Sequence, residues 1–446
     1  MKSNINFRTS YTNSTLKLYG NQLYLPYQLD GLKWLLSREF DSFPRGGLLS
    51  DEMGLGKTIQ IISLIMANPL PYTLIILPPN LISQWLLQFK KFAPFINVVI
   101  HHSKSSLSNL HFGNKKPIVC LTSFHYSTNY RINTHHWDRL IIDEAHMIRN
   151  QKSKRFKSIY NIYSKIRWAI TGTPIQNSFK DFITIATFLR IPTKDIRSNI
   201  ESIKNKYILR RTKDNLIKYN SIFHLPNLYI NNIFVDFQST NELLFYNKVA
   251  GSIIKEHNNY NFKEVLPFEL SLRLRQASIL PQLVIDGYKK KWNINFSNWK
   301  YTNTKLDTII EHIHTNNHRA IIFSHFKKEI LYLKNHIKNR SVYIYDGSIS
   351  KIQKNNIINL SNSEIDILII QIQSGACGLN LQSFSNIYFT SPSWNPSTDL
   401  QAIARSHRIG QINHVQVYNI YINQTIDKRI LEIQQNKLRI INNLLH

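Results

Sequence analysis

Residues Gly46–Thr58, which read GGLLSDEMGLGKT, decide how the first half of the sequence is interpreted. The small apolar run Gly46–Ser50 leads into a glycine-containing loop, and the helical pattern Ile59–Ala67 follows that loop. Gly54 and Gly56 allow backbone N–H groups to turn inward around phosphate oxygens, and the N-terminus of the following helix adds positive potential. The stretch therefore predicts a phosphate-binding loop between a strand and a helix.

The side chains of this loop suit a nucleoside triphosphate. Lys57 can reach the β- and γ-phosphates, and the Thr58 hydroxyl can be a ligand of Mg²⁺. The pattern G-x-x-x-x-G-K-[ST] fails only at its first position, which is Asp51, so an ordinary glycine-containing helix entry is the alternative for the loop taken alone. The predicted nucleotide-binding residues are Asp51, Glu52, Met53, Gly54, Leu55, Gly56, Lys57 and Thr58.

A second motif, RLIIDEAH (Arg139–His146), is an apolar strand that ends in two adjacent carboxylates, Asp143 and Glu144. Ligands of α/β folds bind where parallel strands end at their carboxyl side. Asp143 suits Mg²⁺ through water, and Glu144 suits polarisation of an attacking water. A strand followed by acidic residues is common, but together with the phosphate loop it predicts a site that hydrolyses a nucleoside triphosphate.

Short apolar, β-branched runs recur along both halves of the chain, with helical patterns between several of them. This alternation predicts an α/β fold with doubly wound parallel sheets. The runs are Thr73–Pro79, Asn97–His102, Pro117–Phe124, Arg139–His146 and Arg167–Thr173, then Ala320–His325, Val342–Gly347, Asp366–Ile372, Asn386–Pro392 and Val415–Ile422. The predicted parts are a polar N-terminal segment (1–20), a first lobe (21–224), a helical insertion and connector (225–301), and a second lobe with a C-terminal helix (302–446).

Composition limits the class of protein. The 446 residues include 55 Lys+Arg and 27 Asp+Glu, a formal charge of +28, and 43% are hydrophobic, which is enough to fill the cores of two lobes. The charge favours a polyanionic partner such as nucleic acid, although an AT-rich genome would also enrich Lys, Asn and Ile. Cys120 and Cys377 are too few for a disulfide framework or a four-cysteine zinc site. The N-terminus is polar and the sequence has no long apolar run. We therefore expect a chain that is not secreted through a signal peptide and does not span a membrane.

Near the other end of the chain, QAIARSHRIGQ (Gln401–Gln411) contains Arg405 and Arg408 at a spacing that predicts neighbouring positions on a helix. Guanidinium groups that reach across a cleft between the lobes could neutralise charge developing on the γ-phosphate. The ordinary alternative is a pair of surface arginines on a solvated helix.

These motifs belong to an ordered series that runs from about Leu25 to Ile433. The series is LPYQLDGLKWL (Leu25–Leu35), DEMGLGKTIQ (Asp51–Gln60), LPPNLISQW (Leu77–Trp85), LTSF (Leu121–Phe124), DEAHMIRN (Asp143–Asn150), TGTPIQN (Thr171–Asn177), LRRTK (Leu209–Lys213), IIFSHF (Ile321–Phe326), YDGSIS (Tyr345–Ser350), GLNL (Gly378–Leu381), SWNP (Ser393–Pro396) and QAIARSHRIGQ. It resembles the motif series, including the DEAH box, of the SWI/SNF-type ATP-dependent DNA translocases of helicase superfamily two. That family also accepts a residue other than glycine at the position of Asp51.

The resemblance implies two RecA-like lobes that clamp ATP between them, with Gln28 reading adenine and double-stranded DNA lying across both lobes. Opening and closing of the cleft would then move the protein along the duplex, usually without separating its strands. The residues that the resemblance assigns to coupling or DNA contact are Thr171, Thr173, Gly378, Asn380 and Trp394. For Trp394, packing under the turn at Pro396 is an equally good explanation.

The chain departs from the family pattern at one motif. Where many members read S-T-R-A-G-G before the GLNL segment, this chain has QIQSGA (Gln371–Ala376). A DNA or coupling contact through the missing Thr and Arg is therefore open, whereas the residues of ATP chemistry lie elsewhere. The segment LRLRQASILPQL (Leu272–Leu283) is similar to the connector of relatives in post-replication repair and transcription termination, and the RING insertion of some members is absent.

The leading hypothesis is an ATP-dependent translocase on double-stranded DNA that remodels or displaces complexes in transcription, repair or chromatin. A strand-separating DNA or RNA helicase is one alternative. The other is an inactive scaffold with a nucleotide-binding fold that recruits partners to DNA. The expected location is a nucleus or another compartment that contains DNA, and the compact, AT-rich chain is compatible with a large DNA virus, in which case a viral replication site or the virion is expected.

Overall fold

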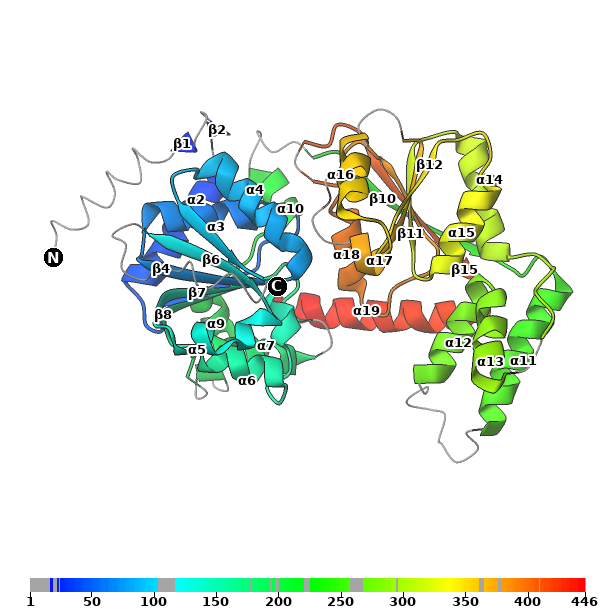
Figure 1. Ribbon diagram of the computed structural model, residues 1–446, viewed down its shortest axis with the longest axis horizontal. Helices are drawn as coiled ribbons and strands as arrows, with labels where there is room; N and C mark the ends of the chain where they lie inside the picture. The colour runs from blue at the N-terminus through cyan, green and yellow to red at the C-terminus, as the bar shows by residue number, and fades with distance from the viewer. Residues whose placement is uncertain are drawn as a thin grey trace. The chain divides into compact units, whose positions relative to one another are not determined.

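The computed structural model (Figure 1) describes residues 17–18, 22–23, 25–102, 117–175, 178–192, 195–196, 200–219, 225–256, 268–293, 296–360, 365–375, 379, 381–408 and 410–445. The chain divides into two compact units, Met1–His224 with Ile440–His446, and Leu225–Arg439. Each unit is built around its own parallel β-sheet with helices packed against it, which confirms the predicted fold class. Within the described residues, no helix is both long enough and apolar enough to cross a membrane.

The first unit contains a seven-stranded sheet in the order β5-β6-β4-β7-β8-β3-β9, and the strand pairs are parallel. In Figure 1, α2, α3 and α4 lie on one side of this sheet, and α5, α6 and α7 lie on the other. Strands β4, β6 and β7 are buried almost throughout, because their sequences are nearly continuous apolar runs. The strands are β3 (Gly46–Leu49), β4 (Tyr72–Leu77), β5 (Asn97–His101), β6 (Ile118–Ser123), β7 (Trp137–Asp143), β8 (Ser164–Ile170) and β9 (Ile208–Leu209).

The helices of this unit follow the strands in the alternating order that the sequence predicts. They are α2 (Pro26–Phe40), α3 (Lys57–Ala67), α4 (Ile82–Phe92), α5 (Tyr130–Thr134), α6 (Lys154–Asn161), α7 (Phe179–Phe188), α9 (Ile200–Tyr207) and α10 (Lys213–Tyr219). Short 3₁₀ turns occur at Pro79–Leu81, Tyr126–Thr128 and Ala145–Ile148, and an antiparallel pair, β1 (Lys17–Leu18) and β2 (Gln22–Leu23), precedes α2.

The second unit contains a six-stranded parallel sheet in the order β10-β15-β14-β11-β13-β12. One apolar cluster joins the sheet to α16 and α18, and another joins it to α14 and α15, so helices cover both faces. The strands are β10 (Leu228–Val235), β11 (Ala320–Ser324), β12 (Val342–Tyr345), β13 (Ile367–Gln371), β14 (Asn386–Phe389) and β15 (Val415–Ile422). The helices are α11 (Thr240–Glu256), α12 (Phe268–Ile279), α13 (Gln282–Trp292), α14 (Thr304–Asn316), α15 (Lys327–His336), α16 (Lys351–Leu360), α17 (Ile372–Gly375), α18 (Pro396–Ile403) and α19 (Ile426–Leu445), of which the residues from Ile440 onward belong to the first unit.

Strand β10 corrects the expectation that the segment 225–301 is helical. It pairs with β15 along its whole length, from Leu228 opposite Val415 to Val235 opposite Ile422. It is an edge strand with a mixed pattern of exposed and half-buried residues, so its sequence LYINNIFV lacks the continuous apolar run of a central strand. The rest of the segment does contain helices α11 to α13, which share an apolar cluster with the start of α19.

A buried ion pair joins α2 to the centre of the first sheet. Arg139 of β7 donates hydrogen bonds from Nε and Nη2 to the two oxygens of Glu39, at 2.6 and 2.5 Å, and neither side chain is exposed. Trp168 of β8 donates from Nε1 to the same carboxylate at 2.8 Å. Asn68, at the end of α3, also donates from Nδ2 to Glu39 Oε2 at 2.7 Å. Donors from two adjacent strands and from Asn68 therefore satisfy the carboxylate, which is the condition under which a buried ion pair is tolerated.

Replacing Glu39 with alanine should destabilise the first unit by about 3–5 kcal/mol, because it leaves the Arg139 charge buried without compensation. The measurement is the free energy of unfolding in urea. The matched control is Lys165→Ala, which removes an ion pair to Asp138 from a lysine side chain that is 62% exposed and should cost less than about 1 kcal/mol. Similar losses in the two variants would contradict the assigned importance of the buried pair.

Candidate functional site

The predicted phosphate loop lies between β3 and α3. Gly54 and Gly56 have positive φ angles of 91° and 76°, in the left-handed region that glycine adopts without strain. Gly56 is the N-terminal cap of α3, so the unpaired N–H groups of the first helical turn face the loop. A Cβ atom on Gly56 would lie 2.7 Å from Nε2 of Gln28, which shows how closely α2 approaches the loop. The backbone therefore has the form of an anion-binding turn.

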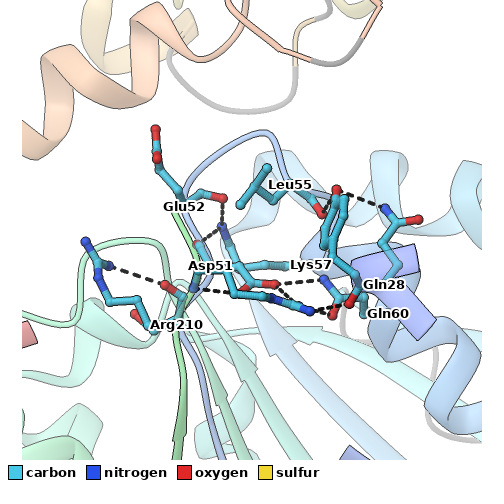
Figure 2. A network of polar contacts seen from close by, with 10 residues as sticks. Gln28, Asp51, Glu52, Leu55, Lys57, Gln60 and Arg210 are labelled. Atoms are coloured by element: carbon cyan, nitrogen blue, oxygen red, sulfur yellow. Dashed lines mark hydrogen bonds and ion pairs between the residues drawn. The ribbon is translucent and has the colours of Figure 1, made fainter. Parts of the chain in front are cut away.

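Lys57 folds back over this loop. Its Nζ donates to the backbone oxygens of Asp51, at 2.7 Å, and Glu52, at 3.1 Å (Figure 2). Burial lowers the pKa of Lys57, while the nearby carboxylates of Asp51, Glu144 and Asp143 act in the opposite direction. The ammonium group thus lies between the loop and the acidic pair, where it can reach a bound phosphate.

The acidic pair lies at the end of β7, as predicted. Oδ2 of Asp143 accepts a hydrogen bond from Trp85 Nε1 at 2.8 Å, and Oδ1 accepts from the backbone N–H of Glu144 at 2.9 Å. Burial and the neighbouring Glu144 charge raise the pKa of Asp143 to about 6. A cation beside Asp143 would relieve this repulsion, and carboxylate and hydroxyl oxygens are ligands that Mg²⁺ prefers. Asp143, with Thr58 on the first turn of α3, therefore fits the predicted metal role.

Polar contacts connect the acidic pair to the TGT turn (Thr171–Thr173) after β8. Nδ1 of His146 lies 3.2 Å from Glu144 Oε2 and 3.2 Å from Thr171 Oγ1. The same hydroxyl oxygen accepts from the backbone N–H of Thr173 at 3.2 Å. The imidazole of His146 therefore connects Glu144 to the TGT turn. This linking role of His146 was not predicted from the sequence.

The TGT turn also packs against the phosphate loop. A Cβ atom on Gly172 would lie 2.8 Å from Cγ of Met53 and 3.4 Å from Nζ of Lys57. Only a residue without a side chain allows the turn to come this close to the loop. The loop, the acidic pair and the TGT turn thus form one continuous site within the first unit.

Gln28, which the family resemblance assigns to adenine, lies on α2 beside this site. Its Oε1 accepts from the backbone N–H of Leu25 at 3.1 Å, and its Nε2 donates to the hydroxyl of Tyr27 at 3.4 Å. Tyr27 in turn donates to the backbone oxygen of Leu55 in the phosphate loop at 2.9 Å. Gln28 is therefore anchored next to the loop, and adenine recognition by this residue stays a prediction.

Besides His146, two further contributors to the site were not assigned a role from the sequence. Trp85 ends the motif Leu77–Trp85 and Arg211 lies in the motif Leu209–Lys213, but neither motif predicts a position at the nucleotide site. Arg211 forms an ion pair with Asp51, whose side chain is fully buried. The available signal was Asp51 itself, because a carboxylate in a phosphate loop requires a cationic partner.

Arg405 and Arg408 do not lie on a helix, which corrects the predicted local structure. Helix α18 ends at Ile403, and the carbonyl of Arg405 accepts from the backbone N–H of Leu381. The Gln411 side chain donates to the backbone oxygen of Ser406 at 3.2 Å, which further holds the chain in turns. Burial and the like charge of Arg405 lower the pKa of Arg408, so an anion near this pair would be stabilised. Their action on the γ-phosphate stays a prediction.

The remaining predicted contacts belong to the second unit. Gly378 and Asn380 lie outside the described residues. Trp394 is half-buried and packs against the apolar cluster formed by α11, α12, α13 and the start of α19. Its backbone oxygen accepts from Lys437 Nζ at 3.0 Å. Trp394 therefore packs against helices, whereas its packing under the Pro396 turn and its DNA contact both stay predictions.

Comparison with known proteins gives two domain matches. Residues 27–195 match the SNF2-related domain, and residues 304–410 match the helicase conserved C-terminal domain. An uncharacterised ATP-dependent helicase of Mycoplasma genitalium is 30% identical over 96% of this chain, which spans only 43% of that relative. A probable global transactivator of Orgyia pseudotsugata multicapsid polyhedrosis virus is 27% identical, with 94% of this chain and 90% of the relative covered. A solved structure of the Sulfolobus solfataricus SWI2/SNF2 ATPase core with double-stranded DNA is 24% identical, with 96% and 95% of the chains covered and a TM-score of 0.43.

Replacing Trp85 with phenylalanine should raise the pKa of Asp143 above about 6, because the indole hydrogen bond favours the ionised carboxylate. The measurement is a pH titration of the Asp143 carboxyl carbon by NMR in magnesium-free protein. Trp137→Phe is the matched control, since that equally buried indole donates to the backbone oxygen of Ile132 instead. An unchanged or lower pKa in Trp85→Phe would contradict the geometry of the acidic pair.

Proposed function

We propose that this chain, which belongs to the SNF2-related family of helicase-like ATPases, hydrolyses ATP to move along double-stranded DNA and displace complexes bound to it. The observation that carries the proposal is the meeting of the phosphate loop, the acidic pair and the TGT turn at one edge of the first sheet. The chain spans less than half of the Mycoplasma relative, so any role that depends on other parts of such relatives is left aside.

In this proposal the loop and its neighbours perform the chemistry. Backbone N–H groups at the start of α3 and the Lys57 ammonium hold the β- and γ-phosphates. Asp143 and Thr58 would hold Mg²⁺, which supplies positive charge to the phosphate oxygens when it is bound. Glu144, at the end of β7, orients and polarises the attacking water. His146 transmits the change at Glu144 to Thr171 through the contacts described above.

Movement along DNA requires that hydrolysis alters the contacts of both lobes with the duplex. We assign this coupling to Thr171 and Thr173, whose link to Glu144 supports the role, and to Gly378, Asn380 and Trp394 by family resemblance. Arg405 and Arg408 would neutralise charge on the γ-phosphate, and the burial of Arg408 beside the charge of Arg405, which lowers the pKa of Arg408, supports an anionic partner. A net charge of +28 supports sequence-independent contacts with DNA phosphates, which weaken as salt increases.

We propose only the class of the complex that the chain displaces from DNA, namely a transcription, repair or chromatin complex. The viral relative, which is described as a probable global transactivator and is covered over 90% of its length, supports a role in transcription. We expect the protein in a nucleus or in another compartment that contains DNA, including a viral replication site or virion. A strand-separating helicase and an inactive scaffold are the competing functions.

The wild-type chain should displace a third DNA strand from a duplex when ATP is present, without separating the duplex itself. Lys57→Ala should lower both ATP hydrolysis and displacement by about 100-fold or more, because it removes the cation that stabilises the transferred phosphate. Its far-UV circular dichroism and melting temperature should stay close to wild type. Lys33→Ala, which removes an exposed lysine on α2, is the control and should retain both activities.

Each competing function predicts a different outcome of this assay. Separation of the duplex strands in place of third-strand displacement would favour the helicase. DNA binding without hydrolysis or displacement in the wild-type chain would favour the scaffold. Hydrolysis that persists in a Lys57→Ala preparation free of contaminating ATPases would show that the nucleotide site is assigned wrongly.

A further inference from the structure

The first residue of the phosphate loop, Asp51, places a fully buried carboxylate where the common pattern has glycine. Its Oδ2 accepts from Nε2 of Gln60 at 3.0 Å (Figure 2). Its Oδ1 accepts from Nε and the backbone N–H of Arg211 at 2.9 and 3.1 Å. Nη2 of Arg211 forms the ion pair with Oδ2. Both oxygens of Asp51 are therefore held, and Arg211 is the group that balances the charge.

Arg211 belongs to a segment, Leu209–Lys213, that runs beside the phosphate loop and that we call the strap. The backbone oxygens of Leu209 and Arg211 accept from the N–H groups of Ser50 and Glu52, at 2.7 and 2.8 Å. At its far end, the N–H of Lys213 donates to Glu52 Oε2 at 2.8 Å. The strap thus extends the pairing of β9 with β3 past the end of the sheet and fixes the first turn of the loop.

Helix α2 closes this network on its other side. A Cβ atom on Gly31 would lie 2.0 Å from Oε1 of Gln60 and 2.8 Å from Nη2 of Arg211, so both polar groups pack directly against the backbone of α2. The guanidinium also lies 5.1 Å from the ring centre of Tyr27, whose hydroxyl donates to Leu55 at the other end of the loop. Arg211 therefore contacts both Asp51, at the start of the phosphate loop, and Tyr27, which is hydrogen-bonded to Leu55 near the end of the loop.

We propose that Arg211 is a positioning residue of the ATP site, which cancels the Asp51 charge and thereby makes the loop able to accept a polyphosphate. The inference rests on the nucleotide site of the proposed function and adds a dependence of that site on the strap. An uncompensated carboxylate at Asp51 would repel the phosphates and attract Lys57, whose Nζ already lies 2.7 Å from the Asp51 backbone oxygen. Arg211 acts through Asp51 and does not need to touch the nucleotide.

The test is a double-mutant cycle of Arg211→Gln and Asp51→Asn in the full chain, with the dissociation constant of a fluorescent ATP analogue as the readout. Arg211→Gln should weaken binding by about 10-fold or more, because the Asp51 charge is then unpaired beside the phosphates. Asp51→Asn/Arg211→Gln should bind within about threefold of wild type, because the charge and its partner are removed together. Lys33→Gln, which breaks an exposed ion pair on α2, is the matched control and should bind like wild type.

Recovery of binding in the double variant distinguishes a positioning role of the Arg211 charge from a merely structural role. If Arg211 only held the fold together, the double variant would bind as weakly as Arg211→Gln or more weakly, and that result would overturn the inference. Equal binding by wild type and Arg211→Gln would also overturn it, while leaving the proposed function intact. Failure of the wild-type chain to bind the analogue would instead count against the nucleotide site itself.

A second comparison does not require the Arg211→Gln single variant to fold. In the Asp51→Asn background, the inference predicts that Arg211→Gln changes the dissociation constant by less than about threefold. A loss of about 10-fold or more in that background would show that Arg211 serves the site without its charge partner and would overturn the inference.

Discussion

The arrangement of the first unit depends on the parallel order of β7, β8, β3 and β9. Asp143 pairs in register with Ile170, Ile170 with Leu49, and Leu49 with Leu209. The residues that follow these strands are Glu144, Thr171, Ser50 and Arg210, and they lie in or next to the acidic pair, the TGT turn, the phosphate loop and the strap, respectively. Because all four strands point the same way, their carboxyl ends meet at one edge. A slip of one residue in any of these pairings would turn its side chains to the opposite face of the sheet.

Charge is the second condition that the site must satisfy. Lys57 lies near the carboxylates Asp51, Asp143 and Glu144, and Arg211 pairs with Asp51. Asp51 and Asp143 are both buried. Burial shifts the pKa of Lys57 downward and that of Asp143 upward to about 6, so both groups are held away from their ordinary values. Shifted pKa values of this kind accompany sites that bind charged ligands. A triphosphate with a divalent cation would supply charges of both signs to such a site.

Much of the fold was predictable because the strands of parallel sheets are buried on both faces and read as continuous apolar runs. The phosphate loop and acidic pair were predictable because glycine, lysine and carboxylate positions there are fixed by local chemistry. Strand β10 was not, since its partner β15 begins at Val415, far along the chain, and its own pattern is that of a partly exposed edge. Local patterns cannot show a pairing of that kind.

Two details of the candidate site depended on tertiary contacts that the sequence does not display. Helical spacing suggested that Arg405 and Arg408 share a helix, but contacts of that segment with Leu381 and Gln411 hold it in turns. Asp51 indicated a missing cation, yet several arginines could have supplied it. Only the pairing of β9 with β3 brings Arg211 to that carboxylate.

The central claim is that ATP hydrolysis by this chain is coupled to double-stranded DNA. The most direct measurement is the steady-state rate of hydrolysis without nucleic acid and with single-stranded DNA, double-stranded DNA or duplex RNA, each at low and moderate salt. We predict strong stimulation by double-stranded DNA alone, with a steep loss as salt increases, because the contacts are made with phosphates. Stimulation mainly by single strands or RNA, or no hydrolysis under any of these conditions, would contradict the account.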